Sequence, residues 1–361
     1  MLSMIKLKNI KPLEIKKFFG RFLAFFLISA GIIAGTVLVD QFGPPPVQYT
    51  DDQFDFGPYI PSNYNETEYP VLLDQHSHTI HSDGVLTPEQ NILWHIAHGF
   101  NAMILTDHDN IEGAKIAQKI AREKYNDTIK VIIGQEWTTS RIHMNLLGIS
   151  DLVPKPIGAP TDNDIKAAIN NTHAQGGVVT VNHIPWSLRQ GMNHPNQTDL
   201  IDWGIDYIEV INGDEFDIVS NRDYNATSVG KIAGTDMHNP KDVNAWTGLS
   251  AAEFTEEAIM DALRNKNTTL IYESLEGDTV TSGSVDYSGE PSDNPAYLAV
   301  EPIAIIGNTF EQIYNGGTMT IVLAVLYLMG AFFAAELLRV AKRRYWHHIN
   351  NRKIKKKELV E

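Results

Sequence analysis

Between residues 71 and 272, short apolar stretches alternate with helix-like stretches, and a histidine, aspartate or glutamate follows most of the apolar ones. The apolar stretches are rich in Val, Ile and Leu, as in "PVLL", "NAMILT" and "IKVIIG", which is typical of buried strands. Between them, "TPEQ" at 87–90 has the capping-box pattern of a helix start. At least six such strands with intervening helices predict parallel β-α-β units. No dinucleotide-type glycine fingerprint accompanies them, which favours a closed or distorted barrel over an open nucleotide-binding sheet.

A barrel of this kind would gather the polar residues that follow the strands. In a β/α barrel, the carboxyl ends of the strands converge on one face. Without cations there, the carboxylates would repel one another and the imidazoles would lack partners, so a polynuclear metal site is predicted. The groups at these strand ends are His76, His78, Asp83, His108, Glu136, His143, His183, Asp236 and His238.

The densest of these segments is "DQHSHTIHSDG", residues 74–84. Residues two apart in a strand point to the same face, so His76 and His78 would project together. Two neutral imidazoles can bind a divalent metal, and Asp83 would add an oxygen ligand. The competing interpretation is a polar loop with exposed histidines.

The composition narrows the chemistry further. The chain has no cysteine, which excludes disulfide scaffolds, thiol nucleophiles and cysteine-type zinc sites, so any metal must be held by His, Asp and Glu. Neither a G-x-S-x-G elbow nor a Walker A loop is present, so serine-hydrolase and NTPase functions have no support.

Six motifs then occur in a characteristic order: "HSHTIHSDG", "TDHD", "GQE", "HMNLLGI", "NH" and "GTDMH". In this order they resemble the polymerase and histidinol phosphatase (PHP) domain family of metal-dependent phosphoesterases, over about residues 71–272. The resemblance implies an α/β fold, a distorted (βα)7 barrel, with two or three divalent ions (Zn, Mn or Fe) that serve phosphoester hydrolysis.

The resemblance also implies a role for each residue of the cluster. The first ion would be held by His76, His78, Glu136 and Asp236. Glu136 would bridge to a second ion held by His143 and His183. The third ion would be held by Asp83, His108 and His238. Only about 40 residues separate His143 from His183, so the large cap inserted there in some nucleotide-hydrolysing relatives is expected to be absent.

Other residues near these motifs are candidates for substrate contacts. Arg189, in "HIPWSLRQG", could clamp a phosphate bidentately, or be an exposed loop arginine. His81 and Asp109 border the cluster and could orient ligands or assist a leaving group. Glu209 and Asn212 are weaker candidates for the mouth of the barrel. The residues predicted to act in catalysis are Glu136, Asp236, His238 and Arg189.

The charge of the chain is strongly segregated. The formal net charge is −15, but residues 1–22 carry +5 and residues 336–361 carry +6, which leaves −26 for the middle. Such an acidic body argues against a nucleic-acid polymer as partner, and a small phosphorylated substrate is expected instead. A substrate of that kind would need metal ions to offset the repulsion.

Two uncharged apolar runs lie beside these basic ends, at 22–39 and 318–335. Each has 18 residues, within the range of about 17–25 that spans a bilayer as a helix. The first run is longer than the apolar part of a signal peptide and no A-x-A cleavage site follows it. Because both basic flanks lie outside the pair of spans, the positive-inside rule places both termini in the cytoplasm and the acidic middle outside it.

The predicted organisation follows from these features. The segments expected are a basic tail at 1–21, a transmembrane helix at 22–39, a linker at 40–70, the metallohydrolase domain at 71–275, a linker at 276–317, a transmembrane helix at 318–338 and a basic tail at 339–361. The function expected is a membrane-anchored hydrolase of small organic phosphates or nucleotides. Two alternatives stay open: a metal-dependent hydrolase of non-phosphate esters or amides, and a non-catalytic metal-binding surface protein. The oligomeric state is not predicted.

Overall fold

The structure is a computed structural model that describes residues 12–54, 58–281, 291–315 and 317–358. It forms two compact units, Pro44–Ala299 and the combination of Met1–Gly43 with Val300–Glu361. The ends of both predicted basic tails (1–11 and 359–361) and parts of both predicted linkers (55–57, 282–290 and 316) lie outside the described residues.

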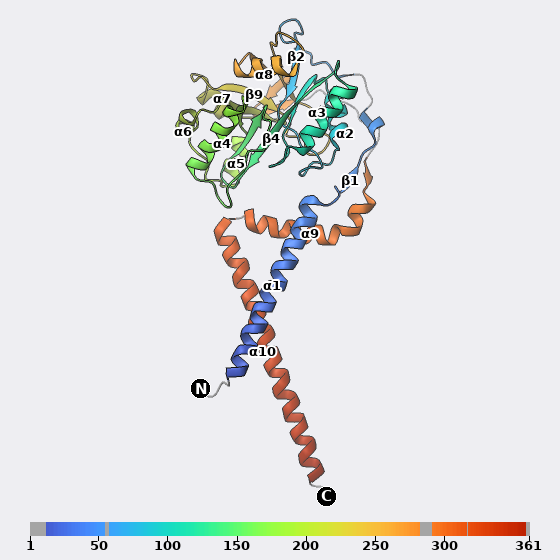
Figure 1. Ribbon diagram of the computed structural model, residues 1–361, viewed down its shortest axis with the longest axis vertical. Helices are drawn as coiled ribbons and strands as arrows, with labels where there is room; N and C mark the ends of the chain where they lie inside the picture. Colours follow the sequence, from blue (N-terminus) through green and yellow to red (C-terminus); the bar gives the residue numbers. More distant parts are fainter. Residues whose placement is uncertain (1–11, 55–57, 282–290, 316, 359–361) are drawn as a thin grey trace. The chain divides into compact units, whose positions relative to one another are not determined.

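The Pro44–Ala299 unit contains most of the secondary structure (Figure 1). Its strands are β1 (Val47–Gln48), β2 (Val71–Asp74), β3 (Ala102–Leu105), β4 (Lys130–Thr138), β5 (His143–Leu147), β6 (Val178–Val181), β7 (Tyr207–Asn212), β8 (Glu215–Phe216), β9 (Gly230–Gly234), β10 (Ala245–Leu249), β11 (Thr268–Tyr272), β12 (Ser274–Glu276), β13 (Thr279–Thr281) and β14 (Ser292–Asp293). Its helices are η2 (Asp51–Phe54), α2 (Pro88–Ala97), α3 (Glu112–Lys124), α4 (Asp162–Ala174), α5 (Ile184–Arg189), α6 (Gln197–Trp203), α7 (Ile218–Asp223) and α8 (Glu256–Arg264).

The main sheet mixes parallel and antiparallel neighbours in the order β11-β10-β2-β3-β4-β5-β6-β7-β8-β13-β12, with β9 paired to β7. The expected parallel units form two blocks, β2-β3-β4 and β6-β7-β9. Between them, β5 is antiparallel to both β4 and β6. Only residues 139–142 join β4 to β5, which is too short for a parallel crossover and forces a hairpin.

The sheet nearly closes into a barrel between β9 and the strands β10 and β2. The hydroxyl of Thr247 on β10 accepts from the backbone N–H of Ala233 on β9 at 2.9 Å. Beyond the strand ends, Asp236 N–H donates to the carbonyl of His76 at 2.8 Å, and His78 N–H donates to the carbonyl of Met237 at 2.9 Å. The predicted α/β, barrel-like fold is confirmed, and its closure brings the segments after β2 and β9 together.

Local signals in the sequence explain the helix that follows the first histidines. Thr87 caps α2 in a complete capping box with Gln90, and Pro88 occupies the first turn. Gly99, with φ +82°, follows the end of this helix in the left-handed region that glycine favours.

Helices of this unit lie around the strands in Figure 1. The largest buried side chains are those of Trp94, Trp137 and Trp246.

Both predicted linkers contain secondary structure. In the first, Phe54 is buried in a hydrophobic cluster with Trp94 and Trp246, and the ring of Tyr59 stacks on Trp246 with centroids 5.7 Å apart. In the second, β13, β14 and helix α9 (Pro295–Asn315) are formed. The loop-like composition ends before Pro295, and the apolar run "PAYLAVEPIAII" that follows is compatible with a helix.

The second unit holds the long helices α1 (Pro12–Phe42) and α10 (Gly317–Glu358) and most of α9. Two segments, Glu14–Asp40 and Thr320–Arg352, are long and apolar enough to cross a bilayer. Phe332 on α10 is buried against the rings of Phe22 and Phe25 on α1. Arg21 donates two hydrogen bonds, at 2.6 and 2.9 Å, to the carboxylate of Glu336. The two helices therefore have specific contacts with each other.

Candidate metal centre

The segment after β2 places two imidazoles inside the barrel mouth. His76 and His78 are both completely buried, with ring centroids 5.2 Å apart. In an extended chain, side chains two residues apart point to the same side, and His76 and His78 keep this arrangement although strand β2 ends at Asp74. The alternative of exposed loop histidines is wrong for this pair.

These two imidazoles face two carboxylates from other strand ends. The Nε2 atoms of His76 and His78 lie 3.3 and 3.2 Å from Oδ1 of Asp236, and each lies 3.6 Å from Oε2 of Glu136. Among the residues that the structure describes, both Nε2 atoms are buried without a hydrogen-bond partner, and Nδ1 of His108 lies 2.8 Å from the same Glu136 oxygen. Ligand atoms about 2.1 Å from a tetrahedral cation lie about 3.4 Å from one another. The donor set and its spacing therefore fit a divalent cation.

The other oxygen of Glu136 faces a second group. Oε1 lies 3.3 Å from Nε2 of His183 and 3.1 Å from Nδ1 of His143. Asn182 donates to the same oxygen at 3.1 Å. His76, Glu136 and His183 have donor atoms close enough to hold one ion. A carboxylate whose two oxygens face two ligand groups has the geometry of a bridging ligand.

A third group lies on the other side of His78. Asp83 brings Oδ1 to 3.2 Å from Nε2 of His238 and Oδ2 to 3.4 Å from Nε2 of His108. Nδ1 of His78 lies 3.9 Å from Asp83, and its ring stacks on that of His238 with centroids 4.1 Å apart. Nδ1 of His238 lies 3.0 Å from the carbonyl of Asp236, which can only accept, so Nε2 of His238 is left as a ligand atom.

The nine predicted ligands thus come together in one cluster. The structure places eight of them in three overlapping groups: His78, Asp83, His108 and His238; His76, Glu136 and His183; and His76, His78 and Asp236. The groups implied by the resemblance differ in detail, because the structure places His76 beside Glu136 and His183 and places His78 in the Asp83 group. His143 contacts Glu136 at the edge of the second group.

Burial and mutual charge shift the pKa values of this cluster strongly. Burial lowers the pKa of His78 to about 3, helped by the neighbouring His238 and His108, so its ring stays neutral. Burial would also lower the pKa of His76, but the charges of Asp236, Glu209 and Glu136 outweigh it and raise that pKa well above 6.5. The carboxylates therefore stabilise positive charge at His76. A divalent cation bound there would supply that charge in place of the proton, because a ligating imidazole must be neutral.

Glu209 on β7 contacts two of the segments that carry predicted metal ligands. Its Oε1 lies 2.9 Å from Nδ1 of His76, and its Oε2 accepts from the backbone N–H of His183 at 3.0 Å. Asn212 donates both to Oε2 of Glu209, at 2.9 Å, and to Oδ2 of Asp236, at 3.1 Å. Such contacts fix the tautomer and orientation of a ligating histidine. Glu209 and Asn212, the weaker candidates from sequence, thus lie directly beside the ligands.

Asp74 is a supporting residue that the sequence analysis missed. Its Oδ1 accepts from the backbone N–H groups of His76, at 3.1 Å, and Thr235, at 3.0 Å. Its Oδ2 lies 3.0 Å from Nε2 of the buried His95. Asp74 therefore joins the segment after β2 to the segment after β9. The available signal was an aspartate at the end of an otherwise apolar strand.

Two ligands have left-handed backbone conformations that are uncommon outside glycine. Asp236 has φ +52° and His183 has φ +27°. Residues held in this region cost about 1–3 kcal/mol each and cluster at functional sites. Their positions are maintained by Asp74 and Glu209, which bind the adjacent backbone N–H groups of Thr235 and His183.

The remaining candidates, Arg189, Asp109 and His81, are not part of the three metal-binding groups. Arg189 is 57% exposed and donates two hydrogen bonds, at 2.6 and 2.7 Å, to Glu215, so the structure pairs it with a carboxylate rather than with the metal groups. Asp109 forms an ion pair with Lys155 and accepts from Thr138 N–H at 3.3 Å. His81 is half-buried near the cluster.

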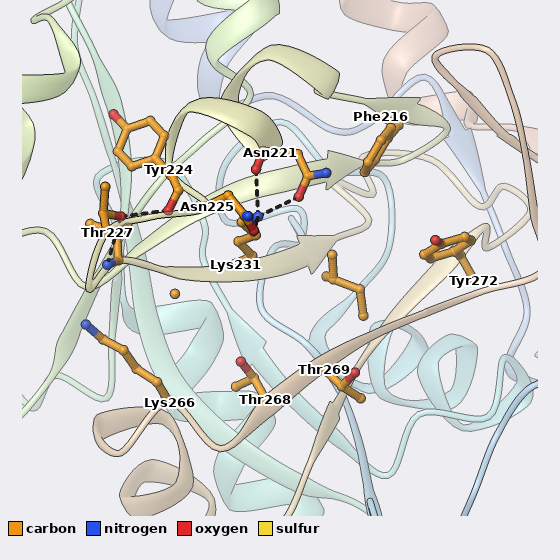
Figure 2. Close-up of a pocket in the computed structure, with 13 residues that line it drawn as sticks. Phe216, Asn221, Tyr224, Asn225, Thr227, Lys231, Lys266, Thr268, Thr269 and Tyr272 are labelled. Atoms are coloured by element: carbon orange, nitrogen blue, oxygen red, sulfur yellow. Dashed lines mark hydrogen bonds between the residues drawn. The ribbon is translucent and has the colours of Figure 1, made fainter.

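A separate surface hollow lies away from the cluster, with a volume of about 490 Å³ (Figure 2). None of the nine predicted ligands lines it. Lys231, one of the residues that line it, is labelled in Figure 2 and donates through Nζ to the carbonyl of Asn221 at 2.6 Å and to Oδ1 of Asn225 at 3.1 Å. This lysine helps to hold the loop after α7.

The fold and the cluster define a barrel protein with the donor set of a metal-dependent hydrolase. The family model of the PHP domain matches residues 74–153, so this part of the chain is similar to a PHP domain. The match includes the first six ligands up to His143, and the structure brings the last three, His183, Asp236 and His238, to the same cluster. No curated protein matches the chain.

Solved structures with similar folds are distant. A two-domain protein of Bacteroides vulgatus, containing a PHP-like domain predicted to be a metal-dependent phosphoesterase, is 21% identical with a TM-score of 0.49 and covers 64% of this chain and 69% of its own. A protein of Bifidobacterium adolescentis classed as a metal-dependent phosphoesterase is 17% identical with a TM-score of 0.39, covering 53% of this chain and 95% of its own. An amidohydrolase of Chromobacterium violaceum, with bound sulfate and no metal, is 16% identical with a TM-score of 0.39, covering 56% and 98%.

Proposed function

We propose that this protein is a metal-dependent phosphoesterase, anchored in the cell membrane by α1 and α10, that hydrolyses small phosphorylated substrates outside the cytoplasm. The proposed phosphoesterase activity is supported mainly by the position of Glu136, whose two carboxylate oxygens face different ligand groups. A carboxylate so placed holds two cations close together, as hydrolysis of phosphoesters by paired metals requires.

The residues of the cluster have two roles in this proposal, to bind the metal ions and to orient the metal ligands. In the arrangement that the family resemblance implies, His76, His78, Glu136 and Asp236 would hold one ion. Glu136 with His143 and His183 would hold a second ion, and Asp83, His108 and His238 would hold a third. Zn, Mn or Fe bound there would activate water at neutral pH and offset charge that develops on phosphoryl oxygens. Glu209 and Asn212 keep the ligand side chains oriented, and the buried walls around His76 and His78 exclude bulk water from the inner side of the site.

The membrane part of the proposal rests on charge and helix length. Both candidate spans have basic residues on the sides nearest the chain ends, and the acidic middle lies between them. Lys and Arg accumulate on the cytoplasmic side of membrane proteins. Both termini are therefore cytoplasmic, and the barrel unit faces the outside.

A substrate panel tests the proposed reaction. The full chain in detergent micelles, loaded separately with Mn, Zn or Fe, is given a phosphomonoester, a phosphodiester and a neutral carboxylic ester. We expect hydrolysis of at least one phosphoester and competitive inhibition by inorganic phosphate or vanadate, which can bind where the reacting phosphoryl group binds. Cleavage of the neutral ester alone, without phosphate inhibition, would instead identify a hydrolase of non-phosphate esters.

A further inference from the structure

Helix α9 exposes apolar side chains on one face. From Val300 onward this helix belongs to the same compact unit as α1 and α10. Ile303, Ile305 and Ile306 are between 42 and 57% exposed there. Thr309 is exposed as well, but its hydroxyl donates to the carbonyl of Ile305 at 2.9 Å, so this polar group is satisfied within the helix. Apolar surface of this kind marks a site that contacts a membrane or another protein.

The other face of α9 carries small residues and contacts α1. Ala304 and Gly307, which are three residues apart and share a face, are both buried. A Cβ atom built on Gly307 would clash with the carbonyl oxygen of Thr36 and lie 2.8 Å from Cβ of Asp40. The backbones of the two helices are therefore in close contact at this point, and Figure 1 shows α9 crossing α1 there. Since a helix turns by about 100° per residue, the two isoleucines between Ala304 and Gly307 point away from this contact.

The contact with α1 lies at one end of a candidate membrane span. Thr36 and Asp40 belong to the last turns of the span Glu14–Asp40, and the second span begins at Thr320, shortly after α9 ends at Asn315. Among the described helices, α9 itself is not a candidate span. In the topology proposed above, the end of the first span and the start of the second are both at the outer surface of the membrane. The middle of α9 and its C-terminal end are thus both at the level of that surface.

We propose that α9 lies along the outer surface of the membrane, with Ile303, Ile305 and Ile306 inserted among the lipid headgroups and the upper part of the acyl chains. This inference rests on the proposed anchoring by α1 and α10. An amphipathic helix binds a bilayer through burial of apolar area and through attraction of basic residues to anionic lipids. Residues 295–315 contain two glutamates and neither lysine nor arginine, so the binding of α9 depends on its apolar face.

The chain has no cysteine, so a label can be placed at a single chosen position. Ile305→Cys and Ile306→Cys are made separately in the full chain, labelled with a nitroxide and reconstituted into phosphatidylcholine vesicles. Electron paramagnetic resonance then compares the access of oxygen, which concentrates in lipid, with the access of a water-soluble nickel chelate. Leu27→Cys, at an exposed position of the α1 span, reports the bilayer interior. Ile218→Cys is the matched control, because it replaces an exposed isoleucine of α7 in the barrel unit.

We expect the labels at residues 305 and 306 to lie about 5–10 Å below the lipid headgroups. The label at residue 27 should lie deeper, and the label at residue 218 should be fully accessible to the nickel chelate. Circular dichroism compares the folding of each variant with wild type. Ile303→Cys supplies a third position on α9 if either of the other substitutions disturbs the fold, and its label should lie at a similar depth.

Three outcomes would overturn the assignment of α9. Access of the nickel chelate equal to that at residue 218 would place this face in water. Exclusion of both reagents would show that protein covers it, either the barrel unit or a second copy of the chain. A depth equal to that of residue 27 would place α9 inside the bilayer. A label at residue 27 that is itself accessible to the nickel chelate would be a different result, because the proposed anchoring would then fail and the role of α9 with it.

Discussion

Oε1 of Glu209 lies 2.9 Å from Nδ1 of His76, and both side chains are fully enclosed in the barrel. Because a carboxylate can only accept, Nδ1 carries the proton and Nε2 is directed at Asp236 and Glu136. This pair decides which nitrogen of His76 is available to a metal.

Replacement of Glu209 by glutamine should therefore weaken metal binding. We expect Glu209→Gln to remain folded and to lose about 10–100-fold in metal affinity, which is the usual effect of removing a group that orients a ligand. Metal titration by calorimetry measures the change. Glu257→Gln, at an exposed position of α8, is the control and should bind metal as wild type. Unchanged affinity in Glu209→Gln would show that His76 is oriented without it.

Glu136 should matter more than any single histidine, because its two oxygens face two ligand groups. We expect Glu136→Gln to lose most hydrolytic activity and one bound ion while remaining folded. Elemental analysis and circular dichroism follow metal and fold, with Glu112→Gln on the exposed face of α3 as control. An active variant with unchanged metal content would contradict a bridging role.

The number of ions is also open to direct measurement. The three ligand groups predict two or three divalent ions per chain. Chelation should lower the melting temperature by several degrees, because a ligand at 100 times its Kd stabilises the folded state by about 2.7 kcal/mol per site. Less than one ion per chain after reloading, or a melting temperature unaffected by chelator, would contradict the metal centre.

A histidine outside the predicted metal-binding groups, His173, provides a test of pH dependence. Nε2 of His173 lies 2.8 Å from Oδ2 of Asp206, and this hydrogen bond raises the pKa of His173 above 6.5. The folded state thus binds the proton more tightly than the unfolded state. The resulting stabilisation is complete below about pH 6.5 and disappears as pH rises through the raised pKa.

Because His173 is 37% exposed, solvent screening reduces the effect to about 0.5 kcal/mol, or about 1–2 °C in melting temperature. We expect His173→Gln to melt below wild type at pH 6 and to approach it at pH 9. Comparison of the two proteins at each pH cancels changes in metal binding. An equal difference at both pH values would mean that protonation of His173 does not contribute.

The proposed topology predicts a protease pattern. Protease added to intact cells or spheroplasts should digest the region between the two spans and spare both basic tails. Antibody tags at the two ends would report which fragments survive. Cleavage of the tails with protection of the barrel unit would establish the opposite orientation.

Features encoded over a few neighbouring residues were predictable from the sequence. The alternation around His76 and His78, the Thr87 capping box of α2 and the positions of the ligands after the strands depend only on local backbone geometry. The two apolar runs likewise follow from length and composition. For these features, the order of residue types along the chain is sufficient.

The partners of buried polar groups depended on the closed barrel instead. Glu209 is 133 residues from His76, and Asp74 is 161 residues from Thr235, yet each pair is hydrogen-bonded. Burial without a partner is costly, so these groups pair with whatever the folded chain brings near them, and no local pattern specifies that choice. Arg189 likewise pairs with Glu215, which is 26 residues away in the sequence, an arrangement that only the tertiary structure decided.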